Sequence, residues 1–248
     1  MPINFFTAKY YHLESWVLAH CIATLTKQFC DQYLNVKNDP KGRLYDQMYM
    51  AARSVYANIA EGTARAATSK ETEMKLIDVA RGSIMELSED YLQVIVEEGG
   101  ELWKTTNPTS KAIMLIPLDI KEYTNGEWAH DAVECIKNQL AYYAPFVADK
   151  PLVETANVLF VLCRKLEVML TSYLEKLLNS FEETGGFAEE LTRVRIAHKQ
   201  QDAVQEGAPR CPQCGKPMLK KMVKKGSRQG DFFWGCSDYP HCNGTRRM

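Results

Sequence analysis

Four cysteines near the C-terminus form the clearest chemical pattern in this sequence. They follow the spacing Cys211-x2-Cys214-x21-Cys236-x5-Cys242. Zn²⁺ prefers a tetrahedron of soft ligands, and two closely spaced cysteine pairs on two turns supply one. Pro212 and Gly215 favour a turn at the first pair, and Gly235 and Pro240 favour one at the second. The pattern predicts one structural Zn²⁺ held by the four cysteine thiolates. His241 is an alternative to Cys242 as the fourth ligand.

The other four cysteines have a different setting. Cys21, Cys30, Cys135 and Cys163 are scattered among apolar residues with helical periodicity, where buried free thiols are common. Disulfides are the alternative, but one metal site in a reducing compartment explains both groups of cysteines. The first residues lack the pattern of a secretory signal, and no apolar run reaches the roughly 18–20 residues of a membrane span. We therefore expect a cytoplasmic protein with no membrane partner.

Charge is distributed unevenly along the chain. From residue 207 to the end, nine Lys and Arg residues face two Asp residues, a net charge of +7, which leaves −8 for the remainder of a chain whose total is −1. Residues 218–225 and 231–234 have the pattern of two strands joined by a glycine-flanked turn, which would bring cations beside aromatic rings. Cations follow a phosphate backbone while aromatic faces stack on unpaired bases. The candidate contacts with nucleic acid are Lys220, Lys221, Lys224, Lys225, Arg228, Phe232, Phe233, Trp234, Tyr239, Arg246 and Arg247. Because so small a module can bury little besides its metal, we expect at least one ring inside and one exposed.

The same segment resembles a known family. It begins Cys-Pro-Gln-Cys-Gly at residue 211 and ends Phe-Trp-Gly-Cys-Ser-Asp-Tyr-Pro-His-Cys at residue 242. These two motifs are similar to those of the C-terminal zinc-ribbon modules of type IA DNA topoisomerases. The resemblance implies a module that binds single-stranded DNA.

Most of the remaining chain is expected to form amphipathic helices. Apolar residues recur at helical spacing over residues 9–36, 44–66, 68–98, 127–143, 151–181 and 188–205. Thr68 and Glu71 suit a capping box, and Gly99-Gly100 suits a helix end. Residues 101–126 form a break with at most a short helix, and Pro145 and Pro151 are expected to flank a joint. We predict a mainly α protein: an up-down four-helix bundle with extra helices over 1–184 (insertion about 101–126), a short helix and linker over 185–208, and a small β-rich zinc ribbon over 209–248.

Two motifs in the helical part also carry a resemblance. Ala-Arg-Ser-Val-Tyr-Ala-Asn-Ile-Ala-Glu-Gly occupies residues 52–62, and Arg-Gly-Ser-Ile-Met-Glu-Leu occupies residues 81–87. Together they resemble the four-helix-bundle family of proteins encoded in ribosomal-RNA intervening sequences, which includes the accessory variability determinants of diversity-generating retroelements. The resemblance implies a ring-shaped homopentamer and, for the retroelement members, a surface that binds nucleic acid and a reverse transcriptase.

The motif residues have two interpretations. They are Asn58, Glu61, Gly62, Arg81, Gly82 and Glu86. A pair between Glu61 and Arg81, with Gly82 allowing a close helix approach, would form a buried polar brace that fixes helix register. The alternative is a surface shared between copies or with a ligand.

Catalysis has little support in the sequence. The helical histidines are isolated, and no phosphate loop, dinucleotide fingerprint or serine elbow is present. Four thiolates leave Zn²⁺ no open position for water. We therefore expect a non-enzymatic, oligomeric accessory protein that binds single-stranded DNA or RNA. The alternatives are a scaffold whose zinc tail docks a protein, or a nuclease with carboxylates gathered between subunits.

Overall fold

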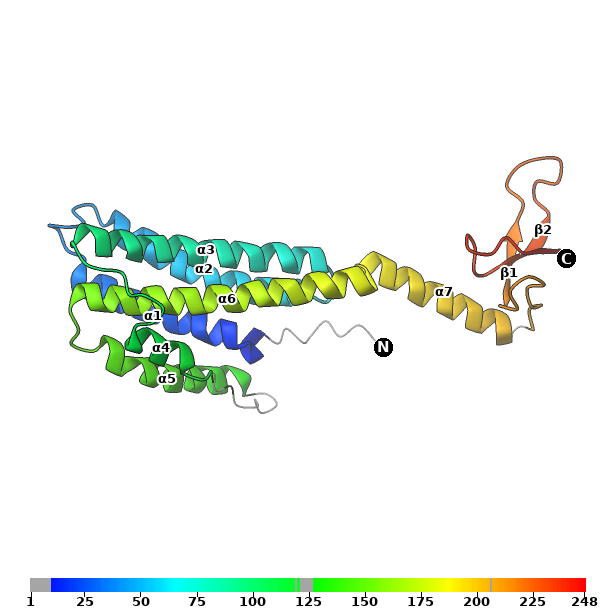
Figure 1. Ribbon diagram of the computed structural model, residues 1–248. Helices are drawn as coiled ribbons and strands as arrows, with labels where there is room; N and C mark the ends of the chain where they lie inside the picture. The colour runs from blue at the N-terminus through cyan, green and yellow to red at the C-terminus, as the bar shows by residue number, and fades with distance from the viewer. Residues whose placement is uncertain (1–9, 119, 121–126, 206) are drawn as a thin grey trace. The chain divides into compact units, whose positions relative to one another are not determined.

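The computed structural model describes residues 10–118, 120, 127–205 and 207–248. The chain divides into two compact units, Met1–Glu183 and Thr184–Met248 (Figure 1). The first contains the long helices, and the second contains one helix and a small antiparallel sheet. The predicted fold class, mainly α with a small β-rich module at the C-terminus, is confirmed. Of the helices that the structure describes, none carries an apolar stretch long enough to span a bilayer.

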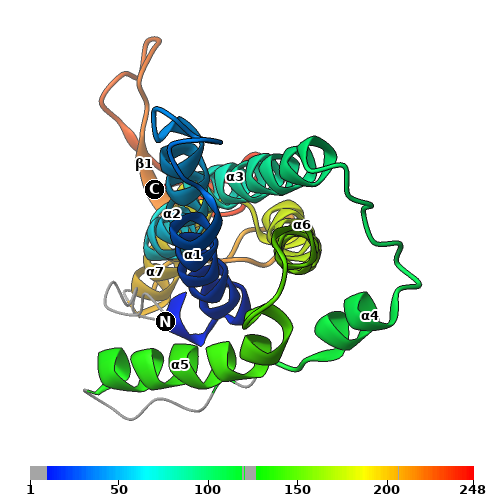
Figure 2. The same ribbon diagram turned by 90° about the vertical axis from the view of Figure 1, so that its left-hand side faces the viewer.

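The first unit is built on four long helices that lie side by side, as Figures 1 and 2 show: α1 (Glu14–Tyr33), α2 (Arg43–Arg65), α3 (Lys70–Glu97) and α6 (Leu152–Thr184). A short 3₁₀ helix, Tyr10–His12, precedes α1, and α4 (Pro108–Leu115) and α5 (Trp128–Val147) lie outside the four. The second unit contains α7 (Phe187–Gln205), β1 (Met218–Met222), β2 (Phe232–Cys236) and β3 (Thr245–Arg247).

Two local expectations about helix ends were wrong. The cap of α3 is Ser69, whose Oγ accepts a hydrogen bond from the Thr72 N–H, whereas the Thr68 hydroxyl donates back to the Arg65 carbonyl. Helix α5 continues through Pro145 to Val147 instead of ending before it. A proline in the last turn of a helix removes a single hydrogen bond, and the bond from the Ala148 N–H to the Ala144 carbonyl still closes that turn.

The bundle core is apolar except for a few polar bonds between helices. The hydroxyl of fully buried Tyr91 donates to the Thr26 hydroxyl at 2.9 Å, which joins α3 to α1. The Tyr173 hydroxyl donates to the buried Glu73 carboxylate at 2.7 Å, which joins α6 to α3. Burial raises the pKa of Glu73, and the hydrogen bond from Tyr173 opposes that rise. Each bond satisfies a group whose burial would otherwise be unfavourable, so these pairs restrict the relative register of the helices.

The segment between α3 and α5 is fixed to the bundle by buried polar side chains. Asn157 on α6 accepts from the Trp103 N–H at 2.7 Å and donates to the Glu101 carbonyl at 3.1 Å. Lys165, about two turns further along α6, donates to the carbonyls of Ile113 and Ile116 at the end of α4. Asn157 is 0% exposed and Lys165 is 9% exposed. The described part of the predicted insertion therefore has a defined path over α6.

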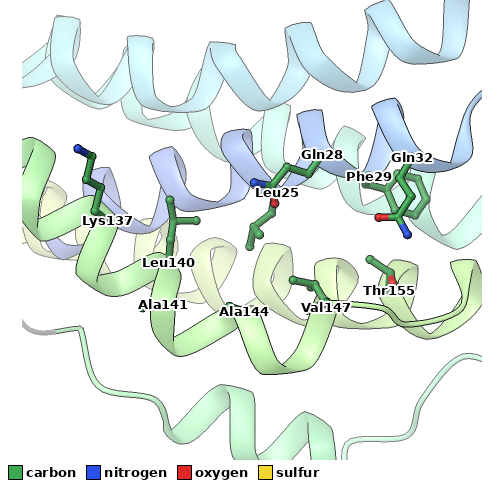
Figure 3. A pocket seen from close by; sticks show the side chains of 11 residues that line it. Leu25, Gln28, Phe29, Gln32, Lys137, Leu140, Ala141, Ala144, Val147 and Thr155 are labelled. Carbon is green, nitrogen blue, oxygen red and sulfur yellow. The ribbon is translucent and has the colours of Figure 1, made fainter.

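Helix α5 does not close fully against α1. A cleft of about 440 Å³ lies between them, and Figure 3 shows Leu25 and Leu140 at its centre. Ala141 and Ala144 line the α5 side. Their side chains are too short to fill the space that separates the two helices, so the cleft stays open.

A histidine in the first unit gives a prediction about pH. His20 stacks on Tyr56 with ring centroids 4.0 Å apart and meets Trp16 edge-on at 4.3 Å. Burial lowers its pKa from 6.5 to about 4. The unfolded chain then binds a proton that the folded chain does not, so stability is full above pH 6.5 and falls as the pH is lowered toward 4. The free energy of unfolding falls by at most about 3 kcal/mol, and the partial exposure of the His20 ring makes the fall smaller.

Replacement of this histidine by phenylalanine isolates its contribution. His20→Phe keeps the aromatic stack and removes the titration, so urea unfolding at about pH 7.5 and about pH 5 should give a smaller difference than in the parent chain. Burial also raises the pKa of Asp90 to about 6. Because Asp90 titrates in both proteins, its contribution cancels from the comparison. Equal pH dependence in His20→Phe and the parent would refute the assignment.

Candidate metal centre and nucleic-acid interface

The first two cysteines lie on a tight turn before β1. The Gly215 N–H donates to the Cys211 carbonyl at 2.9 Å, and the Cys211 N–H donates to the Lys216 carbonyl at 2.8 Å. Gly215 has φ +74°, a left-handed conformation in which a side chain would be strained. The turn therefore requires the glycine that follows Cys214, and it aims both sulfurs toward the same point.

The second pair of cysteines lies after β2. Cys236 is the last residue of that strand, and its sulfur accepts a hydrogen bond from the Asp238 N–H at 3.3 Å. The Cys242 N–H donates to the Asp238 carbonyl, which closes the loop between the two cysteines. An ion pair between Lys216 and Asp238, at 2.7 Å, joins this loop to the first turn. The two cysteine turns are thus held together by backbone bonds and a charge pair as well as by any metal.

The four sulfurs have the spacing of a tetrahedral zinc site. All four lie within 4.8 Å of one another; Cys211 and Cys242 are 3.7 Å apart, and Cys214 and Cys236 are 3.4 Å apart. A tetrahedron with Zn–S bonds of ~2.3 Å has edges of ~3.8 Å. The donor set and its spacing therefore fit one structural Zn²⁺, as the sequence predicted. His241 is exposed and does not belong to this group.

Backbone groups prepare Cys211 to act as a thiolate. Burial raises the pKa of this thiol, but the N–H groups of Gln213 and Cys214 donate to it and bring the pKa down to about 7. Hydrogen bonds to a thiolate stabilise the charged form that binds a metal. Zinc binding at this site is therefore expected to release protons and to weaken as the pH falls.

Gly244 lies directly against the metal site and was not recognised in the sequence. A Cβ atom at this position would lie 2.3 Å from the Cys211 sulfur, far inside van der Waals contact. The Gly244 carbonyl also accepts a hydrogen bond from the Cys236 N–H at 2.9 Å, and this bond holds the Gly244 backbone next to the Cys211 sulfur. The sequence signal was Cys-Asn-Gly at residue 242, where a glycine stands two residues after a ligand.

The contact at Gly244 gives a direct prediction for zinc affinity. Gly244→Ala should displace the Cys211 sulfur and weaken zinc binding by about 10- to 100-fold, the usual range for damage next to metal ligands. Competition with a metallochromic chelator measures this change. Gly82→Ala is the matched control, because a Cβ at Gly82 would meet no atom within 4 Å and this glycine lies in the other unit. Unchanged affinity in Gly244→Ala would show that the site relaxes around the methyl group.

The three strands form an antiparallel sheet in the order β1-β2-β3 with two different faces. Residues directly opposite on paired strands share a face. Trp234 lies between Lys220 and Arg246 on one face, and Phe233 lies between Lys221 and Arg247 on the other. Each face therefore combines an aromatic ring with cations from both neighbouring strands. β3 was not anticipated as a strand, although its arginines were among the predicted contacts.

The aromatic residues divide into inner and outer positions. Trp234 packs against the buried cluster of Cys211, Met218, Cys236 and Cys242. Phe232 is 51% exposed and Tyr239 is 65% exposed. The Lys220 ammonium lies 4.4 Å from the Phe232 ring centroid, and the Lys221 ammonium lies 5.1 Å from that of Tyr239. Each of these two exposed rings thus has a lysine ammonium over one of its faces.

The remaining predicted contacts lie around the loop between β1 and β2. Lys224, Lys225 and Arg228 are all exposed in that loop. Their backbone is organised by hydrogen bonds from Gly230 to Val223 and from Val223 to Asp231. The loop extends the positive charge of the sheet beyond its strands. The sheet also rests on α7, where the Gln200 side-chain amide donates to the Ser237 hydroxyl at 3.0 Å.

The motif residues of the bundle do not form the predicted brace. Arg81 pairs with Asp78 on its own helix at 2.7 Å, and Glu61 and Glu86 are exposed. Asn58 donates to Ser54 within α2. Glu61 and Arg81 have suitable residue types but are not paired, and the polar bonds between helices include Thr26–Tyr91 and Glu73–Tyr173. Between the two motif segments, the Ser83 hydroxyl on α3 bonds to that of Ser54 on α2 at 3.3 Å.

The close helix approach predicted at Gly82 lies elsewhere. A Cβ on Gly82 would meet nothing within 4 Å. At Gly62, by contrast, a Cβ would lie 3.2 Å from that of Leu76 on α3. Gly62 is therefore the motif glycine that lets α2 and α3 pack closely.

Comparisons with known proteins agree with both resemblances. Residues 12–99, which span α1 to α3, match the family described as 23S rRNA-intervening sequence protein. Residues 209–248 match the family described as topoisomerase DNA binding C4 zinc finger. No curated protein and no solved structure gives a significant match. The chain thus combines one segment that matches the 23S rRNA-intervening sequence protein family with another that matches the topoisomerase C4 zinc finger family, and residues 100–208 lie outside both matched segments.

Proposed function

We propose that this protein is a non-enzymatic accessory factor that binds single-stranded nucleic acid through its zinc ribbon. The observation that carries the proposal is the arrangement of exposed aromatic rings beside cations on a sheet fixed by the metal site. Lys220 and Lys221 place an ammonium over one face of Phe232 and of Tyr239, which leaves the other face of each exposed ring for a base to stack on. The description of the matched family, a DNA binding zinc finger, supports the same conclusion.

The charge of the module also favours this ligand. The net charge of +7 from residue 207 onward is concentrated on a small sheet and its loop. Lys224, Lys225 and Arg228 on the loop can follow phosphates beyond the bases that stack on the sheet. Binding of this kind tolerates many sequences, because every base has an aromatic face and every nucleotide has a phosphate. The thiolates must stay reduced to hold zinc, so we place the protein in a reducing compartment, the cytoplasm.

The helical unit has a separate role in the proposal. We propose that it assembles as a homo-oligomer, a ring-like pentamer on the resemblance of its first three helices, and so presents several zinc ribbons together. Linked copies of a weak binding module gain avidity through effective concentration. A reverse transcriptase or another protein would then be recruited by this acidic body rather than by the basic module.

A salt titration tests the nucleic-acid part of the proposal. The zinc-loaded protein should bind a labelled single-stranded oligonucleotide at about 50 mM salt, with a logarithmic salt slope near −0.7 for each phosphate contacted. Fluorescence anisotropy gives both the affinity and the slope. The absence of binding under these conditions would favour the alternative, in which the zinc ribbon docks a protein and the oligomer is a scaffold. Native mass spectrometry of the same sample measures the number of subunits.

A further inference from the structure

We propose that the first unit contains a separate binding site for an amphipathic organic anion, between α4 and α6. A largely apolar cavity of about 590 Å³ opens there, within the range of small-molecule sites. Trp103, Met114 and Phe160 contribute to its apolar wall. Figure 2 shows α4 on the α6 side of the bundle, away from α2. All of its lining residues lie between 103 and 164, outside both segments that match known families.

The cavity has walls that are already fixed without a ligand. Asn157 holds the backbone at Trp103, and Lys165 holds the carbonyls of Ile113 and Ile116 at the end of α4. Gly100 permits the close approach of this segment to α6, because a Cβ there would lie 2.5 Å from Val153. A ligand therefore need not order the segment on binding, which removes one of the main costs of association.

The polar residues at the cavity indicate the charge of the ligand. Lys104, Lys111 and Arg164 are among its lining residues, and none of the described lining residues is acidic. Arg164 is paired with Glu167, so the two lysines, both exposed, are the cations available to an incoming anion. An apolar wall next to two ammonium groups suits an alkyl or aromatic body that carries a carboxylate, sulfonate or phosphate.

One buried hydroxyl gives a second, independent indication. Ser110 lines the cavity and is 5% exposed, and its Oγ has no hydrogen-bond partner among the described residues. Buried polar groups in folded proteins nearly always have a partner. Leu115 at the same cavity is 81% exposed and Met114 is 44% exposed, although both belong to an ordered helix. An occupant would cover these apolar side chains, and the Ser110 hydroxyl, which is itself inaccessible to solvent, would pair with it after a rotation of its side chain.

Anilinonaphthalene sulfonate, an aromatic anion that fluoresces in apolar sites, is the probe for the test. Titrated into the full zinc-loaded chain, it should show one saturable site per chain. Dodecanoate should displace it, whereas dodecanol, which has the same alkyl chain without the charge, should displace it much less effectively. The double variant Lys104→Ala/Lys111→Ala should bind the probe about tenfold more weakly, because two charge contacts are lost.

A matched control separates this site from general attraction to the protein. Lys37→Ala/Lys41→Ala removes two exposed lysines from the loop between α1 and α2 and should leave probe affinity unchanged. Both pairs are exposed, so circular dichroism should show that all variants fold. The proposal is overturned by equal probe affinity in the Lys104/Lys111 variant and the parent, by equal displacement with dodecanol and dodecanoate, or by an absence of saturable binding. None of these outcomes depends on whether the zinc ribbon binds nucleic acid.

Discussion

Replacing Cys236 by alanine is expected to unfold the zinc ribbon and leave the helical bundle intact. Cys236 is 2% exposed, ends β2, and lies 3.4 Å from the Cys214 sulfur. Without its thiolate the tetrahedron is incomplete, and binding of structural zinc supplies ~10–16 kcal/mol of apparent free energy in comparable small modules. The described core of this module consists of three buried cysteines, the buried Met218 and the partly buried Trp234. So few apolar side chains cannot hold the module folded once the metal is lost.

Two measurements check this result. The zinc content should fall from one ion per chain to none, and the module should become sensitive to proteases. Far-ultraviolet circular dichroism should keep most of its helical intensity, because α1 to α6 belong to the other unit. A loss of most of the helical signal would contradict the independence of the two units.

The matched control is Cys163→Ala. Cys163 is fully buried in the core of the bundle, where burial raises its pKa well above the ordinary value of 9.0. It behaves as a small apolar residue, and its replacement should lower the stability of the bundle without changing the zinc content. The pair of variants therefore tests the division of the eight cysteines into four ligands and four core thiols.

The second large effect is expected from the exposed aromatic rings. The double variant Phe232→Ala/Tyr239→Ala should weaken binding of a single-stranded oligonucleotide by at least about 30-fold, because each ring–base stack contributes ~1–3 kcal/mol. Both side chains are more than half exposed, so their loss should leave the zinc content unchanged. The logarithmic salt slope should also stay constant, since no cation is removed.

An exposed aromatic residue in the bundle provides the control for this variant. Tyr142 on α5 is 52% exposed, similar to Phe232. Tyr142→Ala should bind the oligonucleotide with the parental affinity. If the aromatic double variant bound as tightly as Tyr142→Ala, electrostatics alone would account for binding, and base stacking would have to be abandoned.

Local patterns explain which parts of the structure could be predicted. The metal ligands were recognisable because each cysteine pair and its turn residues are close in sequence, and the helices were recognisable from their apolar periodicity. The aromatic and cationic neighbours on the sheet followed from strand alternation once the turn between them was identified. Gly99 and Gly100 were likewise recognisable as the end of α3, where Gly99 has φ +64°.

The parts that were missed depend on contacts between residues far apart in the chain. Asn157 and Lys165 fix the backbone at residues 103 and 113–116, about 50 positions away, and nothing near them in sequence indicates this role. Gly244 is required by the position of the Cys211 sulfur, which belongs to the opposite end of the module. β3 is a short charged segment, and it pairs with β2 across the loop that carries Cys242. The same reason explains Gly62, whose close neighbour Leu76 lies on the next helix.

The most direct test of the account is the dependence of nucleic-acid binding on the metal. Anisotropy of a labelled single-stranded oligonucleotide should be measured with the zinc-loaded protein, after chelation of the zinc, and after its return. We predict binding in the first sample, its loss in the second and its recovery in the third, with no recovery for Cys236→Ala. Equal affinity in the loaded and chelated samples would contradict the claim that the zinc ribbon forms the binding surface.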